Sequence, residues 1–439
     1  MMDSTPKNSG HGSSQTIAKN GLWQRGRWAL TVTAIVLVAA WFRGIWWPIP
    51  FHSYARQALS QRKNDVALVW LDWATYLASE DGETAFLRAR AYRRIGDFQQ
   101  SMDAIKRARS MQPKSQRFQR EEWLCQAHSG QLNKVSVHVP ELLKDPRGEL
   151  EEIREALVVG CVLKQRYSEA NDLLQTWIAD RPNHARPLLL RAKLRQLKLQ
   201  SAEAIDDLRH AHSIEPDNAE VAFELASSLQ ERNELDEAQP LFIQVLNVPQ
   251  FAGPAHVGLA ICLRSQGDTV RIGQLLERAL TLAPGNAVAV CESGRHQMEI
   301  GNASAAVARL KEAVRIAPRD DECCRVLAMA LTADHKPFEA RQQFEFADKI
   351  RDGKRELTRL EGVLSKNPAD VEAMVGAGSL MLDVADESEG VSRLLAALEI
   401  DPKHRVARKR LADYFTIKAK ANPALNQYVE RYRDPPDSR

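Results

Sequence analysis

The chain has 439 residues, of which 44% are apolar and 6% aromatic, and its 60 basic and 57 acidic residues leave a formal net charge of +3. The near balance of charge, without a basic stripe along the chain, argues against nucleic-acid binding. Helix-forming residues dominate, and no run of alternating β-branched residues bounded by turn residues predicts a sheet, so the composition favours an all-α fold.

The chain begins with a polar tail followed by a long apolar segment. Residues 1–27 are predicted to be disordered, because the first twenty are rich in Ser, Gly and Asn and poor in apolar residues. Trp28 to Trp47 is then interrupted by one charge, Arg43. At about 1.5 Å per residue this segment covers a hydrocarbon layer of about 30 Å, and tryptophans lie near both of its ends, as is typical of the interfacial belt. We expect a single transmembrane helix at 28–47.

A cleaved signal peptide is the alternative for this segment, since Val38, Ala39 and Ala40 offer a small-residue cleavage site. The long tail before it favours an uncleaved anchor. Arg25 and Arg27 directly precede the segment and favour a cytoplasmic amino terminus, which would leave the rest of the chain on the far side of the membrane, the periplasm in a bacterium.

From Pro48 to Ser438 the chain divides into eleven windows of 34 residues, with one spare residue near Gly148 and a sixteen-residue insert. One slot of the windows is always apolar: Leu71, Ile105, Val139, Leu174, Leu208, Phe242, Leu276, Leu310, Phe344, Leu394 and Tyr428. Another is Ala or Gly in nine windows of eleven: Ala55, Ala89, Trp123, Val158, Ala192, Ala226, Ala260, Gly294, Ala328, Gly378 and Ala412. Small residues at fixed offsets let helices approach closely, and the bulky slot fills the contact.

Each window is therefore predicted to be a hairpin of two helices that buries its apolar face only when it is stacked on others. In 287–320, for example, the first helix is expected at about Ala289–Ile300, the turn at Gly301 and Asn302, and the second helix at Ala303–Ile316, ended by Pro318. This pattern of small, bulky and proline slots resembles the tetratricopeptide repeat family. The resemblance implies a right-handed α-solenoid of about eleven hairpins in one elongated domain, with the first helices lining a concave groove that holds a peptide or a partner's helix.

The expected layout is nine repeats over 48–354, an extra helical insert at 355–370, and two further repeats over 371–439. Leu357, Leu360, Val363 and Leu364 recur at helical spacing in the insert. The last window, with Arg431 at a usually small slot, is expected to be a polar cap over the final apolar face.

Motifs that would mark an enzyme are missing from the sequence. It contains no His-Glu-x-x-His, Gly-x-Ser-x-Gly, phosphate-binding glycine loop or Cys-x-x-Cys, and six dispersed cysteines suit helix packing. His210 and His212 point about 200° apart on a helix, which does not suit one metal. We expect no catalytic activity, cofactor, metal or small-molecule substrate.

The sequence therefore predicts a membrane-anchored scaffold that holds a protein or peptide partner, for assembly or quality control of an envelope complex. Two alternatives stay open: a secreted or soluble co-chaperone-like adaptor after signal cleavage, and a substrate-recruiting arm for a separate glycosyltransferase. The candidate groove residues are basic and would attract an acidic partner or lipid headgroups, unless they only form a solvated face. They are Arg56, Arg90, Arg93, Arg94, Arg117, Arg120 and Lys193.

Overall fold

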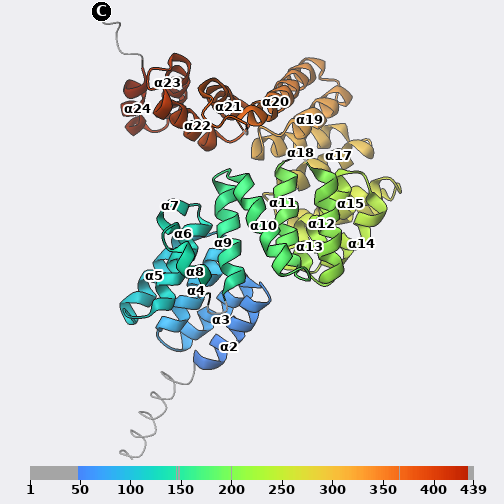
Figure 1. The fold of residues 1–439 in the computed structure, drawn as a ribbon. Coiled ribbons are helices and arrows are strands. Elements are labelled where there is room, and N and C mark those ends of the chain that lie inside the picture. The colour runs from blue at the N-terminus through green and yellow to red at the C-terminus, as the bar shows by residue number, and fades with distance from the viewer. Residues whose placement is uncertain (1–47, 145, 147–148, 199, 365, 434–439) are drawn as a thin grey trace, which may run out of the picture. The chain divides into compact units, whose positions relative to one another are not determined.

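The described part of the protein is entirely helical. The computed structural model describes residues 48–144, 146, 149–198, 200–364 and 366–433, which form the α-helices α2 to α24 and one short 3-10 helix, without a strand (Figure 1). The predicted tail at 1–27 and the predicted transmembrane segment at Trp28–Trp47 lie outside the described residues. Among the helices of the described ranges, none has both the length and the apolar composition needed to cross a bilayer.

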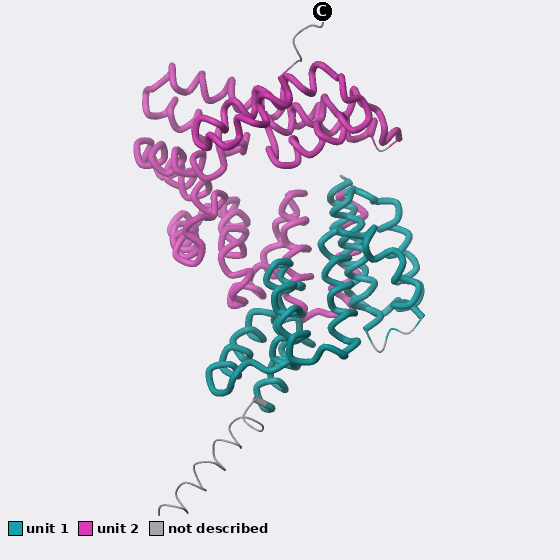
Figure 2. The backbone as a smooth tube through the Cα atoms, turned by 90° about the vertical axis from the view of Figure 1, so that its left-hand side faces the viewer, with its two compact units in different colours: residues 1–200 teal, residues 201–439 magenta. Residues whose placement is uncertain are grey.

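Contacts between the helices group the chain into two compact units, residues 1–200 and 201–439 (Figure 2). The helices of unit 1 are α2 (Pro48–Ser60), α3 (Asn64–Leu77), α4 (Gly82–Ile95), α5 (Phe98–Met111), α6 (Gln116–His128), α7 (Leu132–Val135), α8 (Val139–Lys144), α9 (Leu150–Leu163), α10 (Tyr167–Asp180) and α11 (Ala185–Leu197). The helices of unit 2 are α12 (Ser201–Ile214), α13 (Ala219–Glu231), α14 (Leu235–Val245), α15 (Pro249–Arg264), α16 (Thr269–Leu282), α17 (Ala287–Glu299), α18 (Ala303–Ile316), α19 (Asp321–Ala333), α20 (Pro337–Leu364), α21 (Val371–Val384), α22 (Glu387–Ile400), α23 (Arg405–Ala419), the 3-10 helix η1 (Pro423–Leu425) and α24 (Asn426–Tyr432). The 34-residue repeat alone does not predict where the chain divides into these two units.

The turn between the two helices of a hairpin recurs at the predicted interval. Residues with left-handed backbone occupy it at positions that are 34 or 35 residues apart, or once twice 34: Arg62, Gly96, Gly130, Gln165, Asn233, Gly267, Gly301 and His335. In the window at 287–320, α17 ends at Glu299, Gly301 has a φ of 84°, and α18 begins at Ala303. The helix bounds differ from the predicted ones by two residues or fewer.

The small and bulky slots meet inside the two hairpins that have glycine in the small slot, as the pattern predicts. A Cβ added to Gly294 in α17 would lie 2.5 Å from Cγ of Leu310 in α18, and one added to Gly378 in α21 would lie 2.9 Å from Cγ of Leu394 in α22. Both leucines are fully buried. The two helices therefore approach too closely there for any side chain but hydrogen.

The bulky slot is only partly buried at Val139, Phe344 and Tyr428, and the hairpins of Val139 and Tyr428 are irregular. Val139 lies where the second helix of its hairpin is broken into α7 and α8, since Pro140 has no N–H with which to continue a helix that began before it. Tyr428 lies in α24, the last helix of the described ranges, which has only seven residues. There Phe415 stacks on Tyr428 and Tyr432, with ring centroids 5.1 and 6.0 Å apart.

The sixteen-residue insert is accommodated by a long helix. Its residues from Arg355 to Leu364 continue α20, which has 28 residues, and α21 begins at Val371. The first half of α20 packs through Ala347 and Ile350 in a cluster with Cys324, and its second half packs through Leu360 and Leu364 against α21. The single helix α20 thus packs against both α19 and α21.

Candidate functional site

The predicted basic residues lie on the first helices of successive hairpins in unit 1. They are Arg56 on α2, Arg90, Arg93 and Arg94 on α4, Arg117 and Arg120 on α6, and Lys193 on α11. The six arginines thus lie on the helices α2, α4 and α6, and Arg90 and Arg117 share the ring of Phe86. Their surroundings decide whether they form an open basic groove.

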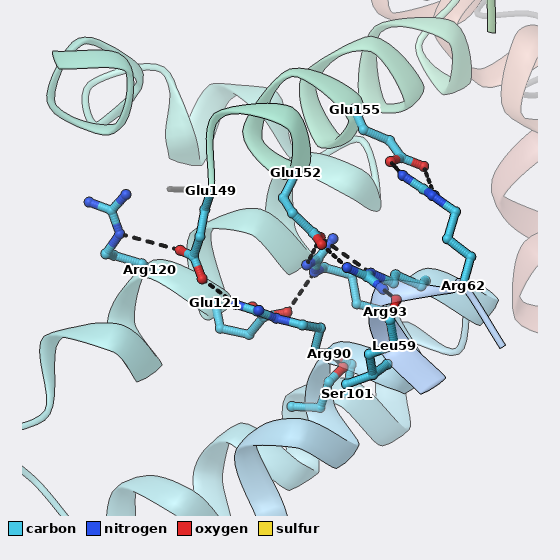
Figure 3. A network of polar contacts seen from close by, with 12 residues as sticks. Leu59, Arg62, Arg90, Arg93, Ser101, Arg120, Glu121, Glu149, Glu152 and Glu155 are labelled. Atoms are coloured by element: carbon cyan, nitrogen blue, oxygen red, sulfur yellow. Dashed lines mark hydrogen bonds and ion pairs between the residues drawn. The ribbon is translucent and has the colours of Figure 1, made fainter. Parts of the chain in front are cut away.

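A set of carboxylates from α6 and α9 faces these arginines. Together they form the arginine–glutamate network, which consists of Arg62, Arg90, Arg93, Arg94, Arg120, Arg186, Glu121, Glu149, Glu152 and Glu155. Figure 3 shows most of this network and labels its members other than Arg94 and Arg186. The α9 glutamates recur every three residues, so they point to the same side of the first two turns of that helix.

Arg93 is the centre of the network, and its side chain is only 1% exposed. Its Nε donates to Glu121 at 2.6 Å and its Nη2 donates to Glu152 at 2.7 Å. Burial alone would lower the pKa of Arg93, but Glu121 outweighs burial and the pKa is raised. The guanidinium is therefore charged, buried and held by two carboxylates, which is a structural arrangement.

The network crosses more than one repeat. Glu152 is 59 residues from Arg93, and Glu155 accepts a hydrogen bond of 2.9 Å from Nη1 of Arg62, 93 residues away in the turn after α2. Burial by itself would raise the pKa of Glu155, but Arg186 and Arg62 outweigh it and hold the pKa well below its usual range. The start of α9 thus contacts both α4 and the turn after α2 through ion pairs.

Several arginines lie close together around Arg94, and the carboxylates of the network offset the repulsion between them. Burial, with Arg93 and Arg62 nearby, lowers the pKa of Arg94 to about 9. Arg94 is held by Glu152 and by the carbonyl oxygen of Leu59, to which its Nη1 donates at 2.6 Å. The predicted basic groove is therefore filled with internal ion pairs in this part of unit 1, and these arginines do not form a solvated face either.

Two of the predicted arginines remain accessible. The side chains of Arg56 and Arg117 are 57% and 42% exposed, and both pair with Glu83, at 2.7 and 2.5 Å. The guanidinium of Arg117 also lies 4.7 Å from the ring centroid of Phe86, in cation–π contact. We refer to Arg56, Arg117, Glu83 and Phe86 as the accessible rim.

In unit 2 the same kind of pairing joins neighbouring first helices. Arg264 on α15 donates to Glu292 on α17 at 2.6 Å, and Arg295 on α17 donates to Glu322 on α19 at 2.6 Å. Arginine–glutamate pairs about 30 residues apart are thus a recurring way of joining adjacent hairpins in this chain.

The described residues hold little that could perform chemistry. No group of three or more His, Cys, Asp or Glu side chains within the described ranges is placed to hold a metal ion. All six cysteines are buried, and burial raises the pKa of Cys262 and of Cys324 to about 11, which disfavours the reactive thiolate.

Reasoning from the sequence missed the carboxylates that neutralise the arginines. Two signals point to them: Glu121 occupies an inward-facing slot of its window, and Glu149, Glu152 and Glu155 recur every three residues at the start of a first helix. What the sequence could not give is the pairing across two and three repeats, which depends on how tightly the first four hairpins curve.

Comparison with known proteins gives a family match for the end of the chain. Residues 351–432 match the model of a family described as tetratricopeptide repeat. No curated protein matches the sequence.

Several solved structures are similar to this chain in part. PilW, described as a widely conserved type IV pilus biogenesis factor, is 22% identical over 45% of this chain and 91% of its own, with a TM-score of 0.40. A tetratricopeptide repeat protein from Parabacteroides merdae is 13% identical over 61% of this chain and 92% of its own, with a TM-score of 0.39. Yeast Tom70 is 13% identical over 88% of this chain and 99% of its own, with a TM-score of 0.34. All identities and scores are low, so these likenesses carry no argument about what this chain binds.

Proposed function

We propose that this chain is a non-enzymatic scaffold, tethered to a membrane by Trp28–Trp47, that binds a protein partner on its stacked helical hairpins. Its hairpins would form a right-handed superhelix, with the amino terminus cytoplasmic and the hairpins on the far side of the membrane. Its task would be the assembly or quality control of an envelope complex. The tetratricopeptide repeat match at 351–432 and the recurring hairpins support a role in protein binding.

The observation that carries the proposal is the contrast between the network and the accessible rim. Arg93, Arg94 and Arg120 are buried among glutamates, so an acidic partner would have to displace internal carboxylates to reach them. Arg56 and Arg117 share one carboxylate and keep much of their surface in water. We infer that the rim, in which the guanidinium of Arg117 lies over the ring of Phe86, is where an acidic segment of the partner is held.

A photocrosslinking residue placed at Gln57, next to Arg56 and exposed, tests this in native cells. The expected result is a discrete crosslinked partner in the membrane fraction, reduced severalfold when Arg56 and Arg117 are both replaced by Glu. Replacing Arg355 by Glu is the control, because the side chain of Arg355 is also accessible, at 74% exposed, but lies in α20. A crosslink that is unaffected by the rim replacement would reject the rim as the binding site, and a chain found wholly in the soluble fraction would reject the membrane tether.

A further inference from the structure

An exposed apolar stripe runs along α3, in the first hairpin. Val66, Val69, Trp73 and Tyr76 are 46%, 54%, 50% and 78% exposed. Their spacing of three, four and three residues places them on one face of the helix. Single exposed apolar residues are ordinary on protein surfaces, but four large ones in line on a surface helix mark a contact face.

The stacking of hairpins does not require this stripe, because the same four slots hold no large apolar residue in the second helices α5, α10 and α16. In α5 they hold Gln100, Asp103, Arg107 and Ser110, and in α16 they hold Arg271, Gln274, Arg278 and Thr281. In α10 they hold Glu169, Asp172, Thr176 and Ala179. At these four slots, α3 therefore has large apolar residues where α5, α10 and α16 do not.

The aromatic end of the stripe lies close to where the chain enters the first hairpin. The ring of Trp70 is 5.0 Å from that of Tyr54 and 6.1 Å from that of Phe51, and the three-residue turn between the helices makes α3 antiparallel to α2. Trp73 and Tyr76, about one and two turns beyond Trp70, accordingly lie at the level of the first turn of α2, on the exposed face of α3. That helix begins at Pro48, directly after the last residue of the segment expected to span the membrane.

We propose that the α3 stripe is embedded in the interfacial layer of the bilayer, so that the first hairpin lies against the membrane surface. This inference rests on the proposed tether at Trp28–Trp47, which ends without a linker before α2 and so keeps this hairpin at headgroup level. Tryptophan and tyrosine favour that layer, because their rings are apolar and their N–H and O–H groups reach water or headgroups.

The charges near the stripe specify the type of attraction. Asp65 and Asp72 are exposed on the same helix, and Asp72 pairs with Arg88 at 2.8 Å. Lys63 is exposed directly before the helix, so the charges beside the stripe balance and give no net attraction to anionic lipids. The apolar burial of the stripe therefore drives the contact. The contact should accordingly form on zwitterionic phosphatidylcholine and should not weaken in high salt.

Fluorophores attached to single introduced cysteines test the contact in the full-length chain, reconstituted in phosphatidylcholine vesicles. All six native cysteines are buried, so the Val66→Cys and Gln100→Cys variants take the label selectively. Gln100 is the matched control, since it occupies the slot of Val66 in the next second helix. The label at position 66 should be quenched severalfold more by nitroxide lipids than the label at 100, whereas aqueous iodide should quench mainly the label at 100. A Trp73→Ser, Tyr76→Ser background should reduce the lipid quenching at 66.

The outcomes separate the occupants of the stripe and the two proposals. Equal iodide quenching at 66 and 100, in protein that floats with the vesicles, would overturn the interfacial contact but leave the tether intact. A label at 66 that is shielded from both quenchers would show that protein covers the stripe, either the preceding segment or a second copy, and would also overturn the contact. Failure of the chain to float would overturn the tether, and the α3 proposal with it.

Discussion

Replacing Glu121 by Gln removes the charge of the most deeply buried carboxylate in the arginine–glutamate network and keeps the shape of its side chain. Glu121 is 1% exposed and accepts from Arg93 at 2.6 Å and from Arg90 at 3.4 Å. The amide of Gln can still accept one hydrogen bond, but it leaves Arg93 with Glu152 as its remaining counter-charge. The variant therefore measures what the buried charge contributes to the stability of unit 1.

The expected cost is large for a change of one functional group. Two charges about 4 Å apart interact by about 4 kcal/mol at an effective dielectric constant near 20. Removal of one partner from a buried pair costs about 3–5 kcal/mol. Because Arg93 keeps Glu152, we expect the lower end, a loss of about 3 kcal/mol in the free energy of unfolding of unit 1.

Urea unfolding combined with hydrogen exchange of the α4 and α6 amides measures this loss. Glu356→Gln is the control, since Glu356 pairs with Arg359 on an exposed face of α20 and should leave stability unchanged. Burial would raise the pKa of Glu121, but Arg93 and Arg90 outweigh it and lower the pKa. The contribution of Glu121 is thus fully present above about pH 4.5 and is lost as the pH falls through its lowered pKa in the fold. If Glu121→Gln were no more destabilising than Glu356→Gln at pH 7, the network would not be structural.

Three further outcomes follow from local geometry. Gln165→Gly should raise the free energy of unfolding by up to about 1 kcal/mol in a urea titration, because Gln165 has a φ of 57° in its turn; a loss of stability would contradict the strained turn. Gly294→Val should lower the melting temperature by an amount that corresponds to about 3 kcal/mol, because a Cβ there meets Leu310 at 2.5 Å; an unchanged melting temperature would mean that α17 and α18 do not approach so closely. Burial, with Arg93 nearby, lowers the pKa of His128 to about 4 from an ordinary 6.5. The free energy of unfolding of unit 1 should therefore fall by about 3 kcal/mol between pH 6.5 and pH 4, and that of the His128→Phe variant should fall less over the same range. Equal acid sensitivity of both proteins would rule out His128 as the responsible group.

The repeat could be predicted because it depends on residues that are close in sequence. Gly294 and Leu310 belong to one hairpin, and their contact needs only the 34-residue pattern and the size of a side chain. The same holds for the turn at Gly301. The long α20 was also within reach, since Leu357, Leu360 and Leu364 keep the helical period through the insert.

Only the basic residues of the candidate site could be predicted from the sequence. The arginines were visible as inward-facing basic residues, but their partners on α9 come from two repeats away, and no local pattern states which faces a curved stack brings together. Arg93 is therefore buried and Arg56 lies in the accessible rim, although the sequence alone does not distinguish these two arginines.

Reaction of the folded full-length protein with phenylglyoxal, followed by peptide mass spectrometry, tests the division between network and rim directly, because the reagent modifies arginines that it can reach. Arg56 and Arg117 should be modified early, and Arg93, Arg94 and Arg120 should be protected until the protein is unfolded. Modification of Arg93 as fast as Arg56 in the folded protein would mean that the inner side of unit 1 is open to partners, and the distinction drawn here between structural and available arginines would be wrong.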